Sequence, residues 1–456
     1  MEDQIMKKFL FLILTAVFIL GACGGFQIGD SESSNPSEED SASGETEGNG
    51  AEGSNGEKVT LDFWSFWGSE QRRPVIDKII EDFNSSQDEI EVQHTYVPWG
   101  DIWTKNLAAI AAGDPPDVII NDINTVKLRA QEGQMEPITE FVDSDVEDRF
   151  YDQMTEAAMY DDEMYALPFN TDTQILFYNK DLFEEAGLDP EDPPSTWAEA
   201  EEYAAQLDVE EGGSYERIGF YPLIGSGTDV WMMNALGENY ISADGDVKID
   251  TEPVHDTFNW ILEQKNKYGE NTITSINSQF ENAQQDPFMA GNIGMMVQNA
   301  NYYVQLRDFG QDMDFGVAPL PEKEEGNGHT SWGGGFVAEI PKGAKDPEAS
   351  YKFIEFLTNH DSQLYWAENN FDLVAHEEAG SSAAESDEFS EAGQEVYSLM
   401  VENMDNTLLT PQPLVAPDFA STVNPTFESI ISGNTTVEAG LEKAQSDLER
   451  IVENNR

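Results

Sequence analysis

Strand and helix patterns alternate strictly over residues 59–120. Residues 59–66 carry apolar side chains at every second position, which is the period of a half-buried strand. Further strands are predicted from residue 90 and at 118–120, and an apolar helical face lies between each pair. This order indicates an α/β fold with a parallel sheet. Ligands of such sheets bind beyond the carboxyl ends of the strands, so the residues after Phe63 and Ile120 are the first candidates for a site.

Local signals mark the ends of several predicted helices. Pro74 is placed to open the first helix, and Asp101 to cap the second, which Gly113 then ends. A buried-type strand is predicted at 294–297 and a helix at 349–357. The last helix is predicted to start from a capping box formed by Thr435 and Glu438.

The length and charge of the chain exclude several classes of protein. Its 456 residues indicate two domains with a large buried core. The chain has 89 acidic and 23 basic residues, a formal net charge of −66 at pH 7. Because the acids are spread along the whole chain, nucleic acid and anionic membrane are excluded as partners. We interpret the acidity as a solvated, halophilic surface suited to high external salt, where charges are strongly screened.

The N-terminus has the pattern of an export signal followed by a tether. Lys7 and Lys8 precede a short apolar run, residues 9–20, which ends in Leu-Gly-Ala-Cys at 20–23. This tetrapeptide resembles a bacterial lipobox, so residues 1–22 are predicted to be a signal peptide and Cys23 to be lipidated. Residues 23–57 are predicted to form a disordered acidic tether. Cys23 is the only cysteine, which excludes internal disulfides and cysteine-based metal sites.

Several segments of the remaining chain resemble, in order, the extracellular solute-binding proteins that include the maltose and glycerol-phosphate binders of ABC importers. The segments that carry the resemblance are LDFWSFW (61–67), AAGDPPDV (111–118), YALPFN (165–170), LFYNKDLF (176–183), GL (187–188), PSTW (194–197), FMAGNIGMM (288–296), FGVAPLP (315–321) and WGGG (332–335).

This resemblance implies two α/β lobes, with a periplasmic-binding-protein-like fold, a hinge that the chain crosses more than once, and a ligand cleft between the lobes. The first lobe would comprise residues 58–170 and 299–345. The second would comprise residues 171–298 and 346–456, including the C-terminal helices.

The residues near the expected cleft suit a sugar, because a pyranose has apolar faces and a rim of hydroxyl groups. The candidate ligand-binding residues are Trp64, Phe66, Trp67, Asn121, Asp122, Asn170, Asp229, Trp231, Tyr302, Trp332, Gly333 and Gly334. Strand alternation assigns at least one of the first three to packing. The glycines after Trp332 allow a ligand to approach the backbone closely.

The resemblance further implies a lipid-anchored, monomeric substrate-binding protein at the outer face of the cell membrane. It would capture a mono- or oligosaccharide and deliver it to separate ABC permease subunits, without cofactor, metal or catalytic residues. Alternatives are a polyol phosphate, polyamine or peptide ligand, or a sensor with this fold. A phosphate would require basic residues, and the candidate loops carry few. A glycoside hydrolase is disfavoured, and the sequence has neither an H-E-x-x-H nor a G-x-S-x-G motif.

Overall fold

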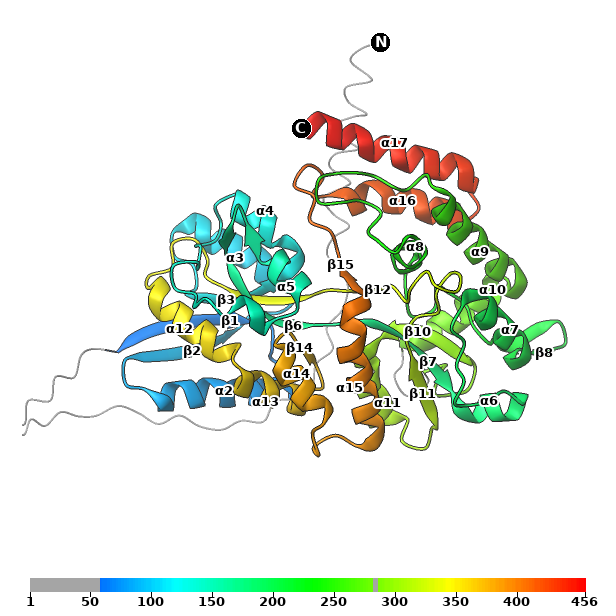
Figure 1. The fold of residues 1–456 in the computed structure, drawn as a ribbon, viewed down its shortest axis with the longest axis horizontal. Helices are drawn as coiled ribbons and strands as arrows, with labels where there is room; N and C mark the ends of the chain where they lie inside the picture. Colours follow the sequence, from blue (N-terminus) through cyan, green and yellow to red (C-terminus); the bar gives the residue numbers. More distant parts are fainter. Residues whose placement is uncertain (1–57, 282–285) are drawn as a thin grey trace, which may run out of the picture. The chain divides into compact units, whose positions relative to one another are not determined.

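The computed structural model describes residues 58–281 and 286–456, and its first three strands lie in one six-stranded sheet (Figure 1). The strand order is β14 (Leu373–Val374), β6 (Ala166–Thr171), β13 (Gly335–Glu339), β3 (Val118–Asp122), β1 (Val59–Ser65) and β2 (Ile90–Tyr96). β1 pairs in parallel with β2 and β3, which confirms the parallel arrangement predicted for residues 59–122. β13 and β14 add antiparallel pairs, so the complete sheet is mixed.

A second, antiparallel sheet has the order β10 (Met295–Asn299), β7 (Gln174–Asn179) and β11 (Phe315–Ala318). Three smaller pairs are β12 (Ser331–Gly333) with β15 (Thr407–Leu409), β4 (Met159–Tyr160) with β5 (Glu163–Met164), and β8 (Val209–Glu211) with β9 (Ser214–Arg217). The α-helices are α2 (Arg72–Ser86), α3 (Ile102–Ala112), α4 (Val126–Gln131), α5 (Asp152–Ala157), α6 (Lys180–Ala186), α7 (Trp197–Leu207), α8 (Thr228–Leu236), α9 (Glu252–Tyr268), α10 (Glu270–Asn277), α11 (Tyr303–Phe309), α12 (Pro347–Leu357), α13 (His360–Asn370), α14 (Glu377–Ala384), α15 (Glu391–Asn403), α16 (Phe419–Ile431) and α17 (Val437–Asn455).

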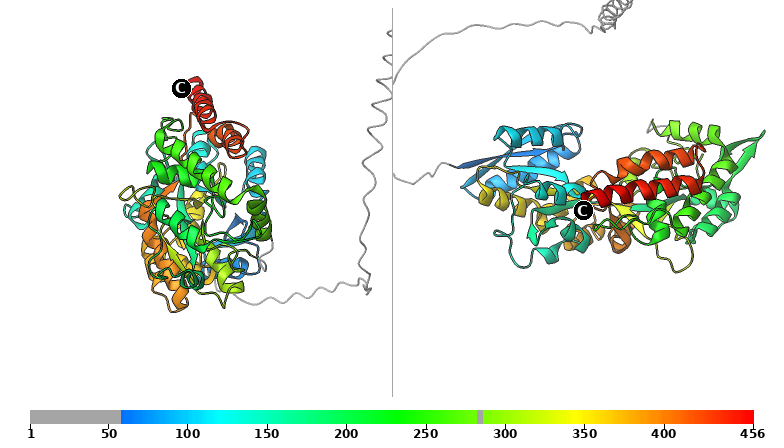
Figure 2. Two further views of the ribbon diagram at one scale, coloured as in Figure 1. Left: turned by 90° about the vertical axis from the view of Figure 1, so that its right-hand side faces the viewer. Right: turned by 90° about the horizontal axis from the view of Figure 1, so that it is seen from above.

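The helices bury the apolar faces that the sequence predicted. α2 buries Ile76, Ile79, Ile80 and Phe83, and packs with α12 and α13 on the first sheet (Figure 1). α16 and α17 lie side by side and pack against α9 in the part of the molecule that holds the second sheet (Figure 2). None of the helices in the described residues is long and apolar enough to span a bilayer.

Helix ends agree with the sequence in one case and differ in three. α2 begins at Arg72, so Pro74 lies within its first turn and does not open it. Gly113 ends α3 in the left-handed conformation, with φ of 76°, which a glycine adopts at no steric cost. Asp101 does not cap this helix, because its carboxylate instead lies 3.3 Å from the Lys105 ammonium. The cap of α17 is Thr436 and not Thr435, since the Thr436 hydroxyl accepts the hydrogen bond from the backbone N–H of Ala439.

The chain passes between the two sheets at positions that correct part of the predicted division into lobes. The first passage runs from β6 to β7 through Asp172 and Thr173. The return does not occur at residue 299, because β10, α11 and β11 continue along the second sheet and β11 pairs with β7. It occurs at Gly334, between β12 and β13. Since β14 pairs with β6 and α12 packs against β1 and β6, residues 346–374 also belong to the first lobe and not to the second.

A buried network of hydrogen bonds, which we call the polar network, joins the chain segments at these passages. The Thr173 hydroxyl lies 2.7 Å from the Thr407 hydroxyl and 3.2 Å from that of Ser331. The Asn403 amide donates to the Thr173 oxygen at 2.7 Å, and the Gln174 backbone N–H donates to Ser331 at 3.1 Å. All five residues are buried. Buried hydroxyl and amide groups that do not contact water must hydrogen-bond to one another. The polar network therefore connects β7, β12, β15 and the end of α15.

Candidate ligand-binding site

Polar side chains gather where the chain passes from one sheet to the other. We call Asp122, Asn124, Asp172, Asn299 and Gly334 the crossing cluster. The Asp172 carboxylate accepts a hydrogen bond from the Gly334 N–H at 2.7 Å. The Asp122 carboxylate accepts one from the Asn124 N–H at 2.8 Å, which caps the short helix after β3. A Cβ at Gly334 would lie 3.7 Å from the Asn124 amide nitrogen, so this glycine sits directly against the cluster.

The crossing cluster concentrates carboxyl groups away from solvent. Burial raises the pKa of Asp122 and of Asp172, and the nearby Asp372 carboxylate raises the pKa of Asp172 further. Hydrogen bonds from Gly334 and Asn299 act in the opposite direction and stabilise the charged form of Asp172. The side-chain oxygen of Asn124 is buried and has no hydrogen-bond partner in the structure. The cluster therefore offers acceptors that suit a ligand rich in hydroxyl donors.

Aromatic side chains lie at the carboxyl ends of the neighbouring parallel strands. We call Phe66, Trp99, Trp103 and Phe336 the aromatic shelf. Phe66 packs against Trp99 at 4.7 Å between ring centroids and against Phe336 at 5.0 Å. Trp64 lies beside the shelf: its indole N–H donates to Asp62 at 2.7 Å, and its ring packs on the same small apolar cluster as Phe66 and Trp103. Of the predicted three, Phe66 is the one with ring contacts to Trp99 and Phe336.

Trp99, Trp103 and Phe336 were missed by the sequence analysis. The available signal was the position of Trp99 just after the second strand, which is the same signal that selected Trp64 after the first. Phe336 had no such signal, because its place next to Phe66 depends on β13 pairing with β3 across more than two hundred residues.

A pocket of about 370 Å³ lies between residues packed near the first sheet and the segment that follows α8. We call it the interlobe pocket. Its lining residues are Lys127, Gln153, Glu156, Ala157, Glu238, Asn239, Ser242, Ala243, Thr407, Leu408, Leu409, Thr410, Pro411 and Gln412. Trp332 borders it, since the Trp332 indole donates to the Thr410 hydroxyl at 3.0 Å. The lining contains one basic side chain, Lys127, which lies 3.9 Å from the Glu156 carboxylate.

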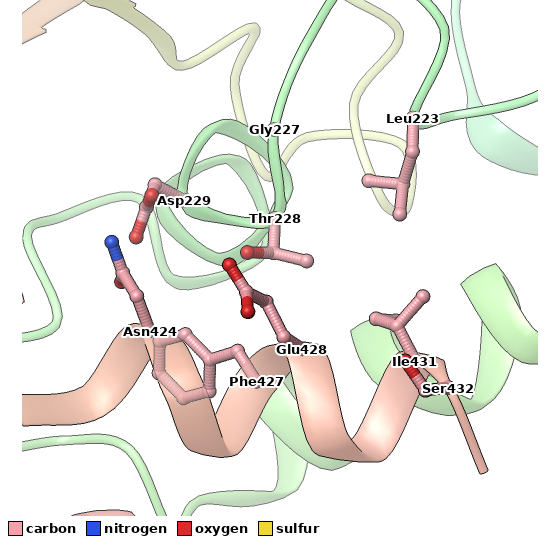
Figure 3. Close-up of a pocket in the computed structure, with 9 residues that line it drawn as sticks. All are labelled: Leu223, Gly227, Thr228, Asp229, Asn424, Phe427, Glu428, Ile431 and Ser432. Carbon is pink, nitrogen blue, oxygen red and sulfur yellow. The ribbon is translucent and has the colours of Figure 1, made fainter. Parts of the chain in front are cut away.

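Asp229 lies in a separate pocket of about 410 Å³ between the start of α8 and α16 (Figure 3). The Asp229 and Asn424 side chains point toward one another across it. Burial raises the pKa of Asp229, and one oxygen of each side chain is buried without a partner. This pocket is polar on the α8 side and apolar along Phe427 and Ile431. It is a second place where the structure provides unpaired acceptors.

Four predicted site residues are used mainly for packing or internal hydrogen bonds. Trp67 is fully buried against Phe169 and Trp366, and Trp231 is fully buried with its indole N–H on the Pro222 carbonyl. Both are therefore core residues, and we remove them from the candidate site.

Tyr302 is buried against Phe177, and its hydroxyl lies beside Asp286. Asn121 is buried and donates to Glu339 at 2.9 Å.

The remaining predicted residues lie at the crossing. Asn170 is buried and hydrogen-bonds Asp372, which places it beneath the crossing cluster. Gly333 is packed so tightly against the Asp172 carbonyl that no Cβ would fit there. The glycines after Trp332 therefore serve close backbone packing at Gly333 and leave Gly334 against the cluster. No group of three or more His, Cys, Asp or Glu side chains in the described ranges is arranged to hold a metal ion.

Comparison with known proteins places this geometry in a family. The model of the family described as bacterial extracellular solute-binding protein matches residues 78–391. A putative binding protein of Brucella abortus (strain 2308) is 24% identical over 395 residues, 83% of this chain and 90% of its own. The sn-glycerol-3-phosphate-binding periplasmic protein UgpB of Escherichia coli (strain K12) is 24% identical over 334 residues, 68% of this chain and 72% of its own.

Solved structures of sugar-bound and sugar-binding proteins have a similar fold. CpMnBP1 with mannotriose bound has a TM-score of 0.70 and 25% identity, covering 86% of this chain and 100% of its own. The cyclic alpha-maltosyl-1,6-maltose binding protein from Arthrobacter globiformis has a TM-score of 0.72 and 21% identity, covering 87% and 100%.

The chain therefore belongs to the bacterial extracellular solute-binding protein family, as the sequence resemblance predicted. Its predicted two-lobed α/β fold is confirmed by the two sheets and by these structural likenesses. The family and the similar proteins bind solutes and are not enzymes.

Proposed function

We propose that this protein captures a sugar at the crossing cluster and the adjoining aromatic shelf. The observation that carries the proposal is the combination of two partly buried carboxylates, Asp122 and Asp172, and the unpartnered Asn124 amide oxygen with a group of aromatic rings at one edge of one sheet. Hydroxyl groups would donate to Asp122, Asn124 and Asp172, while the apolar face of a ring would cover aromatic carbon. The mannotriose-bound structure of similar fold supports this choice of ligand.

We also propose that the protein acts as a lipoprotein that delivers its ligand to an ABC permease. The motif at residues 20–23 supports lipidation of Cys23, which lies outside the described residues. Two acyl chains are sufficient for stable membrane anchoring. The residues 23–57 would then link the anchor to the folded body, which we expect to act as a monomer.

A cationic solute such as a polyamine is the second candidate, and a specific observation favours it. The Asp122 and Asp372 carboxylates lie near enough to raise the pKa of Asp172, and the Arg72 guanidinium pairs with Asp372 at 2.8 Å and not with Asp172. A bound cation would stabilise the charge of Asp172 and could rest on an aromatic face. A phosphate ester is less suitable, because Lys127 is the one base in the interlobe pocket and already faces Glu156.

A thermal-shift panel tests these candidates directly. A ligand that binds only the folded state stabilises it by about 2.7 kcal/mol at 100 times its Kd. We expect mannose- or glucose-based sugars to raise the melting temperature, and spermidine and glycerol 3-phosphate to leave it unchanged. A shift with spermidine alone would replace the sugar by a polyamine, and a shift with glycerol 3-phosphate alone would overturn both candidates.

A further inference from the structure

We propose that His360 and His376 form an acid-sensitive fastening for helix α14: as neutral side chains they hold the start of the helix, and protonation releases it. We call these two residues the histidine pair. The inference concerns a conformational property of the folded body, and it holds whichever solute the protein binds.

The first observation is that His376 is the N-cap of α14. Its ring nitrogen Nδ1 accepts a hydrogen bond from the backbone N–H of Ala379 at 3.3 Å. A histidine nitrogen accepts only while it carries no proton, because both ring nitrogens are donors in the charged form. Protonation at Nδ1 therefore places a donor against the Ala379 donor and removes the cap. The commoner serine, threonine and asparagine caps do not titrate in this way.

The second observation is that His376 is enclosed by the protein. It is only 6% exposed. Phe150 packs against the imidazole with ring centroids 6.0 Å apart, and the two residues form an isolated antiparallel bridge. A charged imidazole would lose hydration here, so burial lowers the pKa of His376. The ring is therefore neutral near pH 7, as its role as a cap requires.

The third observation is that His360 contacts the same helix from the start of α13. The rings of His360 and His376 are 5.8 Å apart and nearly perpendicular, at 80°. His360 Nε2 lies 3.3 Å from the Ser382 hydroxyl on α14, and its Nδ1 lies 3.0 Å from the Asp361 carboxylate. Positive charge on His360 lowers the pKa of His376 further. With both rings protonated, like charges would repel at the start of α14.

The other charged groups around the cap act in both directions. Arg149 lowers the pKa of His376, whereas Glu378 on α14 raises it. Burial and His360 outweigh Glu378, because the pKa of His376 is lowered overall. The carboxylates beside Glu377, the first residue of α14, are Asp152 and Asp405.

The position of α14 places this fastening next to the crossing between the sheets. α14 lies between α13 and α15 and packs against both (Figure 1). It follows β14, which pairs with β6 at Asn170 and Thr171, directly before Asp172. The end of α15 carries Asn403 of the polar network. The family is extracellular, so the folded body meets the pH of its surroundings. We therefore expect acid to loosen α14 locally, beside the crossing.

The direction of the effect follows from the lowered pKa. The contribution of the cap to stability is full above the ordinary histidine pKa of about 6.5, and it is lost as pH falls through the lowered value of the folded protein. Buried carboxylates act in the opposite direction, so the global melting temperature does not isolate the cap. Local hydrogen exchange at α14 does.

The experiment measures hydrogen exchange by mass spectrometry on the full chain at about pH 7.5 and about pH 5, on either side of the ordinary histidine pKa. About 2 M NaCl screens the net charge, and rates are corrected for the intrinsic effect of pH on exchange. α17 is the internal reference, because its cap is the Thr436 hydroxyl, which does not titrate. His376→Asn keeps an acceptor without a titrating ring. His255→Asn is the matched control, since His255 lies on α9 and contacts Asp250 at 2.7 Å.

We expect α14 of the wild type to be about fivefold less protected at the lower pH, on the scale of losing an N-cap, and α17 to be unchanged. His376→Asn should protect α14 equally at both pH values, and His255→Asn should behave like wild type. In a proton NMR titration, the His376 ring should titrate below the ordinary histidine value. Its midpoint should move upward in His360→Gln, because a positive neighbour is removed.

Equal protection of wild-type α14 at both pH values would overturn the proposal. The same acid-dependent loss in His376→Asn would also overturn it, because the proton would then act at another group. A loss shared equally by α17 would show general loosening by acid, with the same consequence. An unmoved midpoint in His360→Gln would break the pair. Should His376→Asn not fold, the wild-type comparison of α14 with α17 and the titration in His360→Gln still decide.

Discussion

The Asp172 carboxylate and the Gly334 backbone N–H form a 2.7 Å hydrogen bond that joins two separate passages of the chain between its sheets. Asp172 lies between β6 and β7, and Gly334 between β12 and β13. The Thr171 hydroxyl strengthens the connection by donating to the Gly334 carbonyl at 2.8 Å. The same carboxylate that fixes the geometry of the crossing is thus placed among the groups that we propose to bind ligand.

Replacing Asp172 should separate its structural role from its charge. Asp172→Ala leaves the Gly334 N–H without an acceptor, and we expect a loss of about 1–3 kcal/mol in the free energy of unfolding. Asp172→Asn keeps an acceptor and removes the repulsion from Asp372, so it should lose much less. Urea unfolding measures both. Asp88→Ala, at an exposed turn, is the control. Equal destabilisation by alanine and asparagine would show that the charge, and not the acceptor, is what matters.

The polar network predicts that removing a single hydroxyl lowers the free energy of unfolding. Thr173→Val has almost the same shape but leaves the Asn403 amide without one of its acceptors and the Thr407 hydroxyl with the Asn403 carbonyl as its remaining partner. We expect the free energy of unfolding to fall by about 1–3 kcal/mol, measured by urea denaturation. Thr60→Val on the exposed face of β1 should change it by less than about 0.5 kcal/mol. An unchanged free energy of unfolding in Thr173→Val would mean that the polar network contributes no net stability.

Trp332 connects the crossing to the interlobe pocket and should matter for binding. Trp332→Ala removes a partly buried ring and the hydrogen bond to Thr410, and we expect sugar affinity to fall by roughly 1–3 kcal/mol in calorimetry. Trp332→Phe, which loses the hydrogen bond but keeps a ring, should lose less. Sugar binding should also change the tryptophan emission of the wild type. Unchanged affinity in Trp332→Ala would exclude this residue from the site.

Charge repulsion predicts that stability depends on salt and on pH. With a net charge of −66, the folded chain should melt at lower temperature as salt is reduced from about 2 M to about 0.05 M NaCl at pH 7, because screening weakens.

Burial raises the pKa of Asp122, Asp172, Asp229 and Glu339, so the folded state binds protons more readily than the unfolded chain. Their contribution to stability is therefore full below the ordinary carboxyl pKa of about 4 and is lost as pH rises through the raised values. Lowering pH from 7 toward 5 at low salt should raise the melting temperature. A melting temperature that is flat or falls with added salt would contradict the halophilic interpretation.

The proposed lipid anchor predicts a simple change of location. Each buried CH₂ group contributes about 0.8 kcal/mol to membrane binding, so loss of the acyl chains should release the protein. Cys23→Ser should therefore appear in the medium, whereas wild type should fractionate with membranes. Ser54→Ala in the same predicted tether is the control and should stay membrane-bound. Retention of Cys23→Ser on the membrane would exclude lipidation at this position.

The sequence by itself determined the order β1–α2–β2–α3–β3 and the family, because both depend on local periodicity and on short motifs that survive in linear order. Only the tertiary structure decided which aromatics are available to a ligand. Trp67 and Trp231 have the same local features as the exposed Trp99, yet the first two are enclosed by side chains from distant segments. The return of the chain at Gly334 was likewise decided by the pairing of β11 with β7 and of β13 with β3. Burial and strand pairing are relations between residues far apart in the chain, and a single sequence records them only indirectly.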